Sequence, residues 1–166
     1  PYLDQLVIQL ANFYRKPQNK VNWIHAHYAD AGYVGVRLSE ILNVPLIFTS
    51  HSLGREKKRR LIDAGLKPSQ IEKFYCISKR IDAEEEVLKK SSMVVTSTKQ
   101  ELIHQYSEYK FFDSHKAKVI SPGVDHEKFH HVHSTTETSD ISNMMNPFLV
   151  DSSKPPLLAI SRAVRR

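Results

Sequence analysis

The sequence has few of the features that mark small secreted or membrane-embedded proteins. It contains one cysteine, Cys76, which excludes an internal disulfide framework and is typical of a protein in a reducing compartment. It has no apolar run of about 18 residues, so we predict no transmembrane helix and no membrane partner. It also lacks a basic segment followed by an apolar stretch at the N-terminus, and we therefore expect no signal peptide and a cytoplasmic location.

The composition is that of a globular protein. The chain has 166 residues, of which 40% are apolar, and this is enough for one domain with a hydrophobic core. The formal net charge is +6, which indicates an anionic partner such as nucleic acid, a nucleotide or a phosphorylated small molecule. The charge alone does not choose among these partners.

Both ends of the sequence suggest a fragment of a longer protein. Pro1 stands where a start methionine is expected, and the last residues, "PPLLAISRAVRR", form a predicted strand that stops just after its polar end. We therefore expect part of the functional apparatus to lie outside the chain.

Strand-like and helix-like segments alternate along the sequence. Strands are predicted at 21–25, 45–49, 93–97, 117–121 and 157–161, and helices at 3–14, 32–42, 55–63, from Ser69 to about Lys90, and from Thr98 onward. Residues 131–155 are rich in His, Ser, Thr, Asp and Asn and are predicted to be a linker or mobile loop. The alternation predicts an α/β fold with a parallel sheet covered on both faces.

Histidines follow the first two predicted strands. Because ligands bind outside the carboxyl ends of parallel strands, His27 and Asp30 are candidates to line a polar substrate cleft. His25 and His27 could instead be paired metal ligands, but nearby cysteines and carboxylates are lacking and we predict no metal site. A third interpretation makes them ordinary strand and loop residues.

The second strand leads into "SHSLGREKKRR". His51 at its tip can donate a hydrogen bond to a substrate hydroxyl or a developing oxyanion, or it can have a capping or packing role. Lys57, in the helix that follows, could reach a phosphate in the cleft. The neighbouring basic residues 58–60 are interpreted as a solvated face.

Other features have plainer interpretations beside the functional ones. Gly32 and Gly35 are expected where a loop enters a helix, either as an anion site or to allow close packing of helix on sheet. Residues 79–90 have the mixed charge of a surface helix, in which Arg80 and Glu84 form an ion pair. A polyanion-binding module would need exposed aromatics, whereas Trp23, Phe48 and Tyr75 are interpreted as core residues. The sequence therefore does not favour a nucleic-acid partner.

Six motifs occur in an order that resembles sucrose-phosphate synthases: "HAHYADAGYVG", "FTSHSLGREK", "SKRIDAEEEVL", "VVTSTKQE", "VISPGVD" and "AISRAVRR". These are retaining glycosyltransferases with two Rossmann-like domains, the GT-B architecture. The resemblance covers residues 1–130 and 156–166. It implies that 1–130 are the later part of the N-terminal acceptor-binding domain, that 131–155 are a linker, and that 156–166 begin the C-terminal donor-binding domain.

The resemblance also implies a reaction, the transfer of glucose from UDP-glucose to fructose 6-phosphate to give sucrose 6-phosphate. His51 falls on the family histidine that contacts the transferred sugar, and we assign it the catalytic role. Lys57 and Arg80 fall on positions associated with the acceptor phosphate, and Ser52 is counted among the substrate-binding residues. Arg162 falls on the arginine that grips the diphosphate of the donor.

Some of the resemblance is incomplete. Ala163 and Val164 stand where many relatives have Pro and Asp, and the family's glycine-rich loop and donor-side carboxylates would precede Pro1 and follow Arg166. The isolated chain is therefore expected to be inactive. No cofactor is implied beyond UDP-glucose as donor substrate. A sucrose synthase, or another GT-B enzyme with a different acceptor, remains the alternative, and a polyanion-binding module is the more distant one.

Overall fold

A computed structural model of the chain describes residues 2–127 and residue 147. Residues up to Pro122 belong to one compact unit, which contains every helix and strand given below. The predicted strand at 157–161, Arg162 and nearly all of the predicted linker lie outside the described residues.

Four parallel strands form the sheet, in the order β1-β2-β3-β4. They span Ile24–His27 (β1), Leu46–Thr49 (β2), Met93–Thr96 (β3) and Ala117–Val119 (β4). The α/β fold with a parallel sheet is therefore confirmed. The first strand begins three residues later than predicted and ends at His27, which places both histidines of "HAH" in the strand itself.

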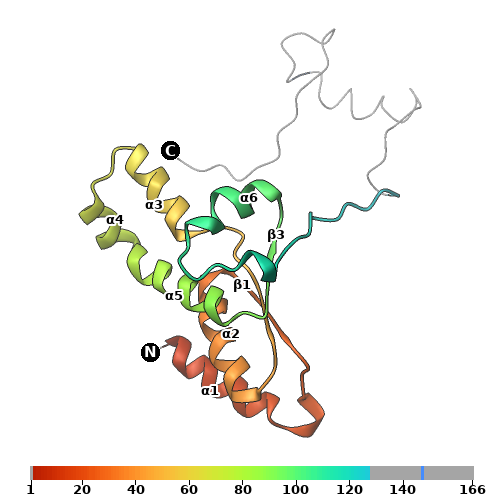
Figure 1. Ribbon diagram of the computed structural model, residues 1–166. Helices are drawn as coiled ribbons and strands as arrows, with labels where there is room; N and C mark the ends of the chain where they lie inside the picture. The colour runs from red at the N-terminus through yellow and green to blue at the C-terminus, as the bar shows by residue number, and fades with distance from the viewer. Residues whose placement is uncertain (1, 128–146, 148–166) are drawn as a thin grey trace. The chain divides into compact units, whose positions relative to one another are not determined.

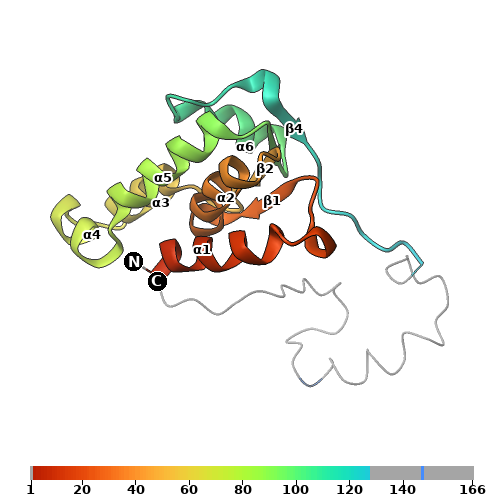
Figure 2. The same cartoon turned by 90° about the horizontal axis from the view of Figure 1, so that it is seen from below.

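Six α-helices surround the strands in residues 2–127. They span Tyr2–Tyr14 (α1), Tyr28–Leu42 (α2), Gly54–Asp63 (α3), Pro68–Tyr75 (α4), Ile77–Lys90 (α5) and Lys99–His104 (α6), with 3-10 turns at Pro17–Asn19, Tyr106–Glu108 and Ser114–Lys116. Helix α2 packs against β1, β2 and α5, and α1 runs beside α2 (Figures 1 and 2). None of these helices is both long and apolar enough to cross a bilayer.

The main core lies on one face of the sheet. Leu46, Phe48 and Val94 are buried there against Val36 of α2 and Val87 of α5. Successive strand residues point to opposite faces, and on the other face Ile47, Met93 and Val95 are only partly buried. The prediction of a sheet covered on both faces is thus wrong for the part of the chain that the structure describes, where helices bury one face.

The two glycines of "ADAGYVG" lie inside α2 rather than at its entrance, which corrects their predicted position. A Cβ atom on Gly32 would lie 2.8 Å from Val87 Cγ2 and 3.1 Å from Phe48 Cε2. One on Gly35 would lie 2.9 Å from Leu46 Cδ1. These glycines let the helix approach the sheet and α5 closely, in agreement with the packing interpretation.

The long helix predicted from Ser69 to Lys90 is two helices. Lys67 rather than Ser69 is the N-cap, and Pro68 occupies the first turn, where its missing N–H costs nothing. Cys76 has a left-handed backbone with φ of 46° and turns the chain between α4 and α5. The interpretation of residues 79–90 as a surface helix also fails, because Glu84 is completely buried.

The aromatic residues divide differently from the prediction. Phe48 is fully buried, but Trp23 is 54% exposed and Tyr75 is 43% exposed. Their supposed burial therefore gives no argument against binding a polyanion.

Candidate functional site

Two histidines meet at the carboxyl edge of the sheet. His27 ends β1 and His51 follows β2, and their Nδ1 and Nε2 atoms are 2.7 Å apart. The rings are stacked with centroids 5.0 Å apart, and the ring of Tyr28 lies 4.8 Å from that of His51. In such a contact one nitrogen donates and the other accepts, so the two imidazoles share one proton between their facing nitrogens.

The backbone at both strand ends is strained. Tyr28 has a φ of 69° and His51 a φ of 54°, in the left-handed region that residues other than glycine rarely adopt. Each such residue costs about 1–3 kcal/mol and persists only where the surrounding structure fixes it, which is often at a functional site. The conformation of His51 presents its exposed side chain at the edge of the sheet, beside His27.

His25 lies behind this pair in β1. Its Nε2 is 2.9 Å from Thr49 Oγ1, and its ring centroid is 4.2 Å from that of His27. Burial lowers the pKa of His25, and the positive charge that His27 and His51 can carry lowers it further. Within residues 2–127 no group of three or more metal-ligating side chains is assembled, so the pairing of His25 with His27 does not extend to a metal site there.

Arg80 of α5 reaches the loop that follows β2. Its Nη2 donates to the carbonyl oxygen of Ser52 at 2.7 Å and to Ser52 Oγ at 2.9 Å, while its Nε donates to Glu84 at 2.9 Å. Arg80 also lines a hollow of about 810 Å³ together with His27, Asp30 and Lys79. The hollow therefore has two cationic side chains from α5 facing polar groups from β1 and α2.

Lys57 lies on the other side of this loop. It lines a smaller hollow of about 420 Å³ with His51, Ser52 and Arg60. Its Nζ is 4.3 Å from the ring centroid of Tyr75, a cation–π contact with a side chain that belongs to the larger hollow. Ser52 and Tyr75 thus connect the surroundings of Lys57 with those of Arg80.

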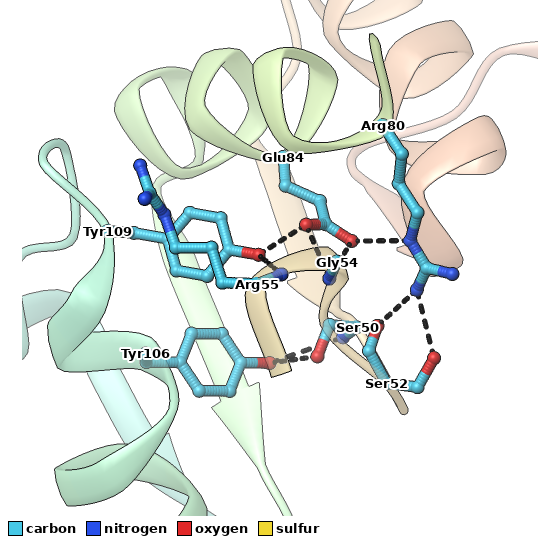
Figure 3. A network of polar contacts seen from close by, with 8 residues as sticks. All are labelled: Ser50, Ser52, Gly54, Arg55, Arg80, Glu84, Tyr106 and Tyr109. Carbon is cyan, nitrogen blue, oxygen red and sulfur yellow. Dashed lines mark hydrogen bonds and ion pairs between the residues drawn. The ribbon is translucent and has the colours of Figure 1, made fainter. Parts of the chain in front are cut away.

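Buried side chains hold the loop in place by its backbone. Ser50 N–H donates to the hydroxyl of Tyr106 at 3.2 Å, and Arg55 N–H donates to the hydroxyl of Tyr109 at 3.1 Å. Gly54 N–H donates to both carboxylate oxygens of Glu84, at 3.1 and 2.9 Å. Figure 3 shows these contacts converging on the loop from α5 and from the segment that carries the two tyrosines. The loop is therefore a fixed part of the fold.

The buried tyrosines are held in their neutral form. Burial raises the pKa of Tyr109, and its hydrogen bond to Glu84 raises that pKa further. Burial likewise raises the pKa of Tyr106. The Tyr109 hydroxyl can therefore donate to Glu84 while it accepts from the N–H of Arg55.

The structure thus brings His27 to His51 and Ser52 to Arg80, and it places Asp30 and Lys57 on the two hollows. Arg162 lies outside the described residues. Sequence reasoning missed Lys79, Tyr75 and Glu84. Lys79 precedes Arg80 directly and carried a signal in its charge, whereas Glu84 looked like any acidic residue of an exposed helix.

Comparison with known proteins agrees with this arrangement. The model of the protein family named Glycosyltransferase Family 4 matches residues 5–128. A sucrose-phosphate synthase from Zea mays is 46% identical over 98 residues, which cover 58% of this chain and 9% of that protein. A probable sucrose-phosphate synthase from Arabidopsis thaliana is 35% identical over 172 residues, covering 84% of this chain and 16% of that protein. The chain thus spans less than a fifth of the length of either relative.

A solved structure shares the fold. The sucrose-phosphate synthase of Thermosynechococcus elongatus matches with a TM-score of 0.65 at 22% identity, over 87% of this chain and 31% of that one. Its GT-B architecture is the one that the sequence resemblance implied, and the parallel sheet of the present chain corresponds to part of it.

Proposed function

Because the chain belongs to glycosyltransferase family 4, we propose that it forms the acceptor side of an enzyme that transfers glucose from UDP-glucose to fructose 6-phosphate. One observation carries the choice of acceptor. Cationic side chains from α3 and α5 lie on both sides of the loop that bears His51, at the edge of the sheet where ligands of parallel folds bind.

Each group has a role in this proposal. Lys57 and Arg80 bind the 6-phosphate of fructose, for which a lysine and a guanidinium are suited donors. His51 contacts the glucose that is transferred and donates a hydrogen bond that strengthens as the donor's glycosidic bond breaks. His27 holds the ring of His51 through the 2.7 Å contact. Arg162 binds the diphosphate of UDP-glucose, and no metal takes part.

The geometry adds one requirement to the phosphate pocket. The charge of Arg80 is already balanced by Glu84, so the net attraction for a phosphate dianion must come mainly from Lys57 and Lys79. Lys79 was not expected from the sequence, and it lines the same hollow as Arg80.

A screen of donors and acceptors on the full-length protein tests the function directly, with release of UDP as the readout. We expect activity with UDP-glucose and fructose 6-phosphate, and far less with fructose. Equal activity with both acceptors contradicts the phosphate pocket and favours a sucrose synthase. Binding of nucleic acid without UDP release favours the polyanion-binding alternative, against which family membership is now the main argument.

Lys57→Ala in the full-length protein tests the pocket itself. We expect the KM for fructose 6-phosphate to rise about tenfold to hundredfold, because a hydrogen bond to a charged group contributes roughly 1.5–3 kcal/mol. The KM for UDP-glucose should stay nearly unchanged. Lys73→Ala, on the exposed side of α4, is the control for loss of one positive charge. An equal effect of the two substitutions would mean that Lys57 acts only through the overall charge.

A further inference from the structure

Glu84 is the most completely buried charged side chain in the described part of the chain, and the proposed function gives it no task. Its exposed fraction is zero, although it lies four residues from Arg80 on a helix of mixed charge. Burying a carboxylate is costly unless it is paired and hydrogen-bonded, so its partners show what it is there for.

All the partners of Glu84 are donors, and they come from three different segments. Gly54 N–H, at the start of α3, donates to both oxygens, Arg80 Nε donates to Oε1, and the Tyr109 hydroxyl donates to Oε2 (Figure 3). This is the set that an ionised carboxylate satisfies and that an amide does not, because an amide offers one acceptor oxygen.

Two of these partners belong to the proposed phosphate site. The contact with Arg80 fixes the guanidinium so that its Nη2 reaches Ser52. The contact with Gly54 fixes the first residue of α3, three residues before Lys57, and places a negative charge at the positive end of that helix. There is little room for a substitute arrangement, since a Cβ on Gly54 would lie 2.9 Å from Glu84 Oε2.

We propose that Glu84 is a positioning residue that sets both Arg80 and the start of α3, and that it thereby determines selectivity for a phosphorylated acceptor without touching substrate. This inference rests on the proposed function for its acceptor. The positioning itself rests on the contacts alone.

The test uses Glu84→Gln in the full-length enzyme, with Glu86→Gln as the matched control. Glu86 lies on the same helix, pairs with Arg37 at 3.3 Å and is partly exposed. Glu84→Gln should raise the KM for fructose 6-phosphate about tenfold or more, the effect expected for losing a charged hydrogen bond. The turnover number, and the KM for UDP-glucose, should stay within about twofold, and Glu86→Gln should change none of these.

A double-mutant cycle separates positioning from general destabilisation. If Glu84 acts through Arg80, then Glu84→Gln has a much smaller effect on this KM when Arg80 is already alanine. A fall in melting temperature with unchanged KM in Glu84→Gln overturns the proposal, because it leaves Glu84 only a structural role. Full additivity of the two substitutions also overturns it.

Hydrogen exchange gives a readout that needs no activity. In Glu84→Gln, peptides that cover residues 50–57 should exchange faster, since Gly54 N–H loses its carboxylate acceptor. Unchanged exchange there overturns the positioning role even if the kinetics change. If the unmutated enzyme does not prefer fructose 6-phosphate to fructose, the proposed function fails, and the positioning role is then decided by the exchange measurement.

Discussion

His51 combines an unfavourable backbone with a specific side-chain contact. Its φ of 54° has a cost, and the fold maintains it through the hydrogen bonds that fix the adjoining Ser50 and Gly54. His27 meets its ring from the neighbouring strand. A residue held in this way without a functional reason would be replaced by glycine at lower cost, which supports a role for the imidazole.

His51→Ala should therefore lower the turnover number more than it raises either KM. A loss on the order of a hundredfold is expected for one well-placed donor in the cleft, while the melting temperature stays close to that of the unmutated protein. Steady-state kinetics and thermal unfolding check the two halves of this prediction. His104→Ala, on the exposed face of α6, is the control. Full activity in His51→Ala would remove the imidazole from the site.

At the scale of single residues, the sequence predicts chemistry better than burial. The position rule for parallel sheets indicated His27 and His51, and the structure shows them in contact. The burial of Glu84 was not predictable, because it depends on Gly54 and Tyr109, which are 30 and 25 residues away along the chain. Nothing in the spacing of "RIDAEEEVL" distinguishes Glu84 from its two acidic neighbours.

Among the elements, the alternation of strands and helices was predictable because apolar periodicity and turn residues are local properties. The break between α4 and α5 was not, since it depends on a left-handed Cys76, a conformation that propensity assigns to Gly or Asn. The capping of α6 was predicted: Thr98 accepts a hydrogen bond from Glu101 N–H at 3.1 Å. The Glu101 carboxylate reaches Ser97 N–H at 2.8 Å rather than the N–H of Thr98.

The packing of α2 gives a test at this scale. Gly32→Ala should lower the free energy of unfolding by about 1–2 kcal/mol, because the new methyl meets Val87 and Phe48 side chains that are fully buried. Helix propensity alone predicts the opposite sign, a gain of roughly 0.5–1 kcal/mol, so the direction decides between the two effects. Gly123→Ala, where a Cβ meets nothing within 4 Å, is the control. Denaturant unfolding measures both, and a stabilised Gly32→Ala would contradict the close packing.

For the described molecule as a whole, the excess positive charge is unevenly available. Glu56 pairs with Arg59 and Arg60, Glu85 with Arg55, and Glu84 with Arg80. The basic run after "SHSLG" is thus largely neutralised on α3 itself, in agreement with its interpretation as a face rather than a binding track. Lys57 differs from its neighbours because it contacts the ring of Tyr75.

These pairs also divide the response to pH into two windows. Hydrogen bonds from Arg59 and then Arg60 lower the pKa of Glu56 below 4.5. Burial alone would raise the pKa of Glu85, but Arg55 and the N–H groups of Lys110 and Phe111 together lower it below 4.5. Lowered carboxyl pKa values stabilise the folded state above 4.5, and this contribution is lost as the pH falls through the folded pKa. Any loss of stability at milder pH must have another source.

His25 is that source in our last prediction. Its pKa in the folded state lies below the ordinary 6.5, first because of burial and then because of His27 and His51. Below pH 6.5 the unfolded chain therefore takes up a proton that the folded chain does not, so stability is fully present above pH 6.5 and declines as the pH falls through the folded pKa. His25→Gln should flatten the decline of the melting temperature between about pH 7 and about pH 5, whereas His104→Gln should leave the slope unchanged. Parallel curves for the unmutated protein and His25→Gln would show that the histidines at this edge of the sheet are not coupled through His25.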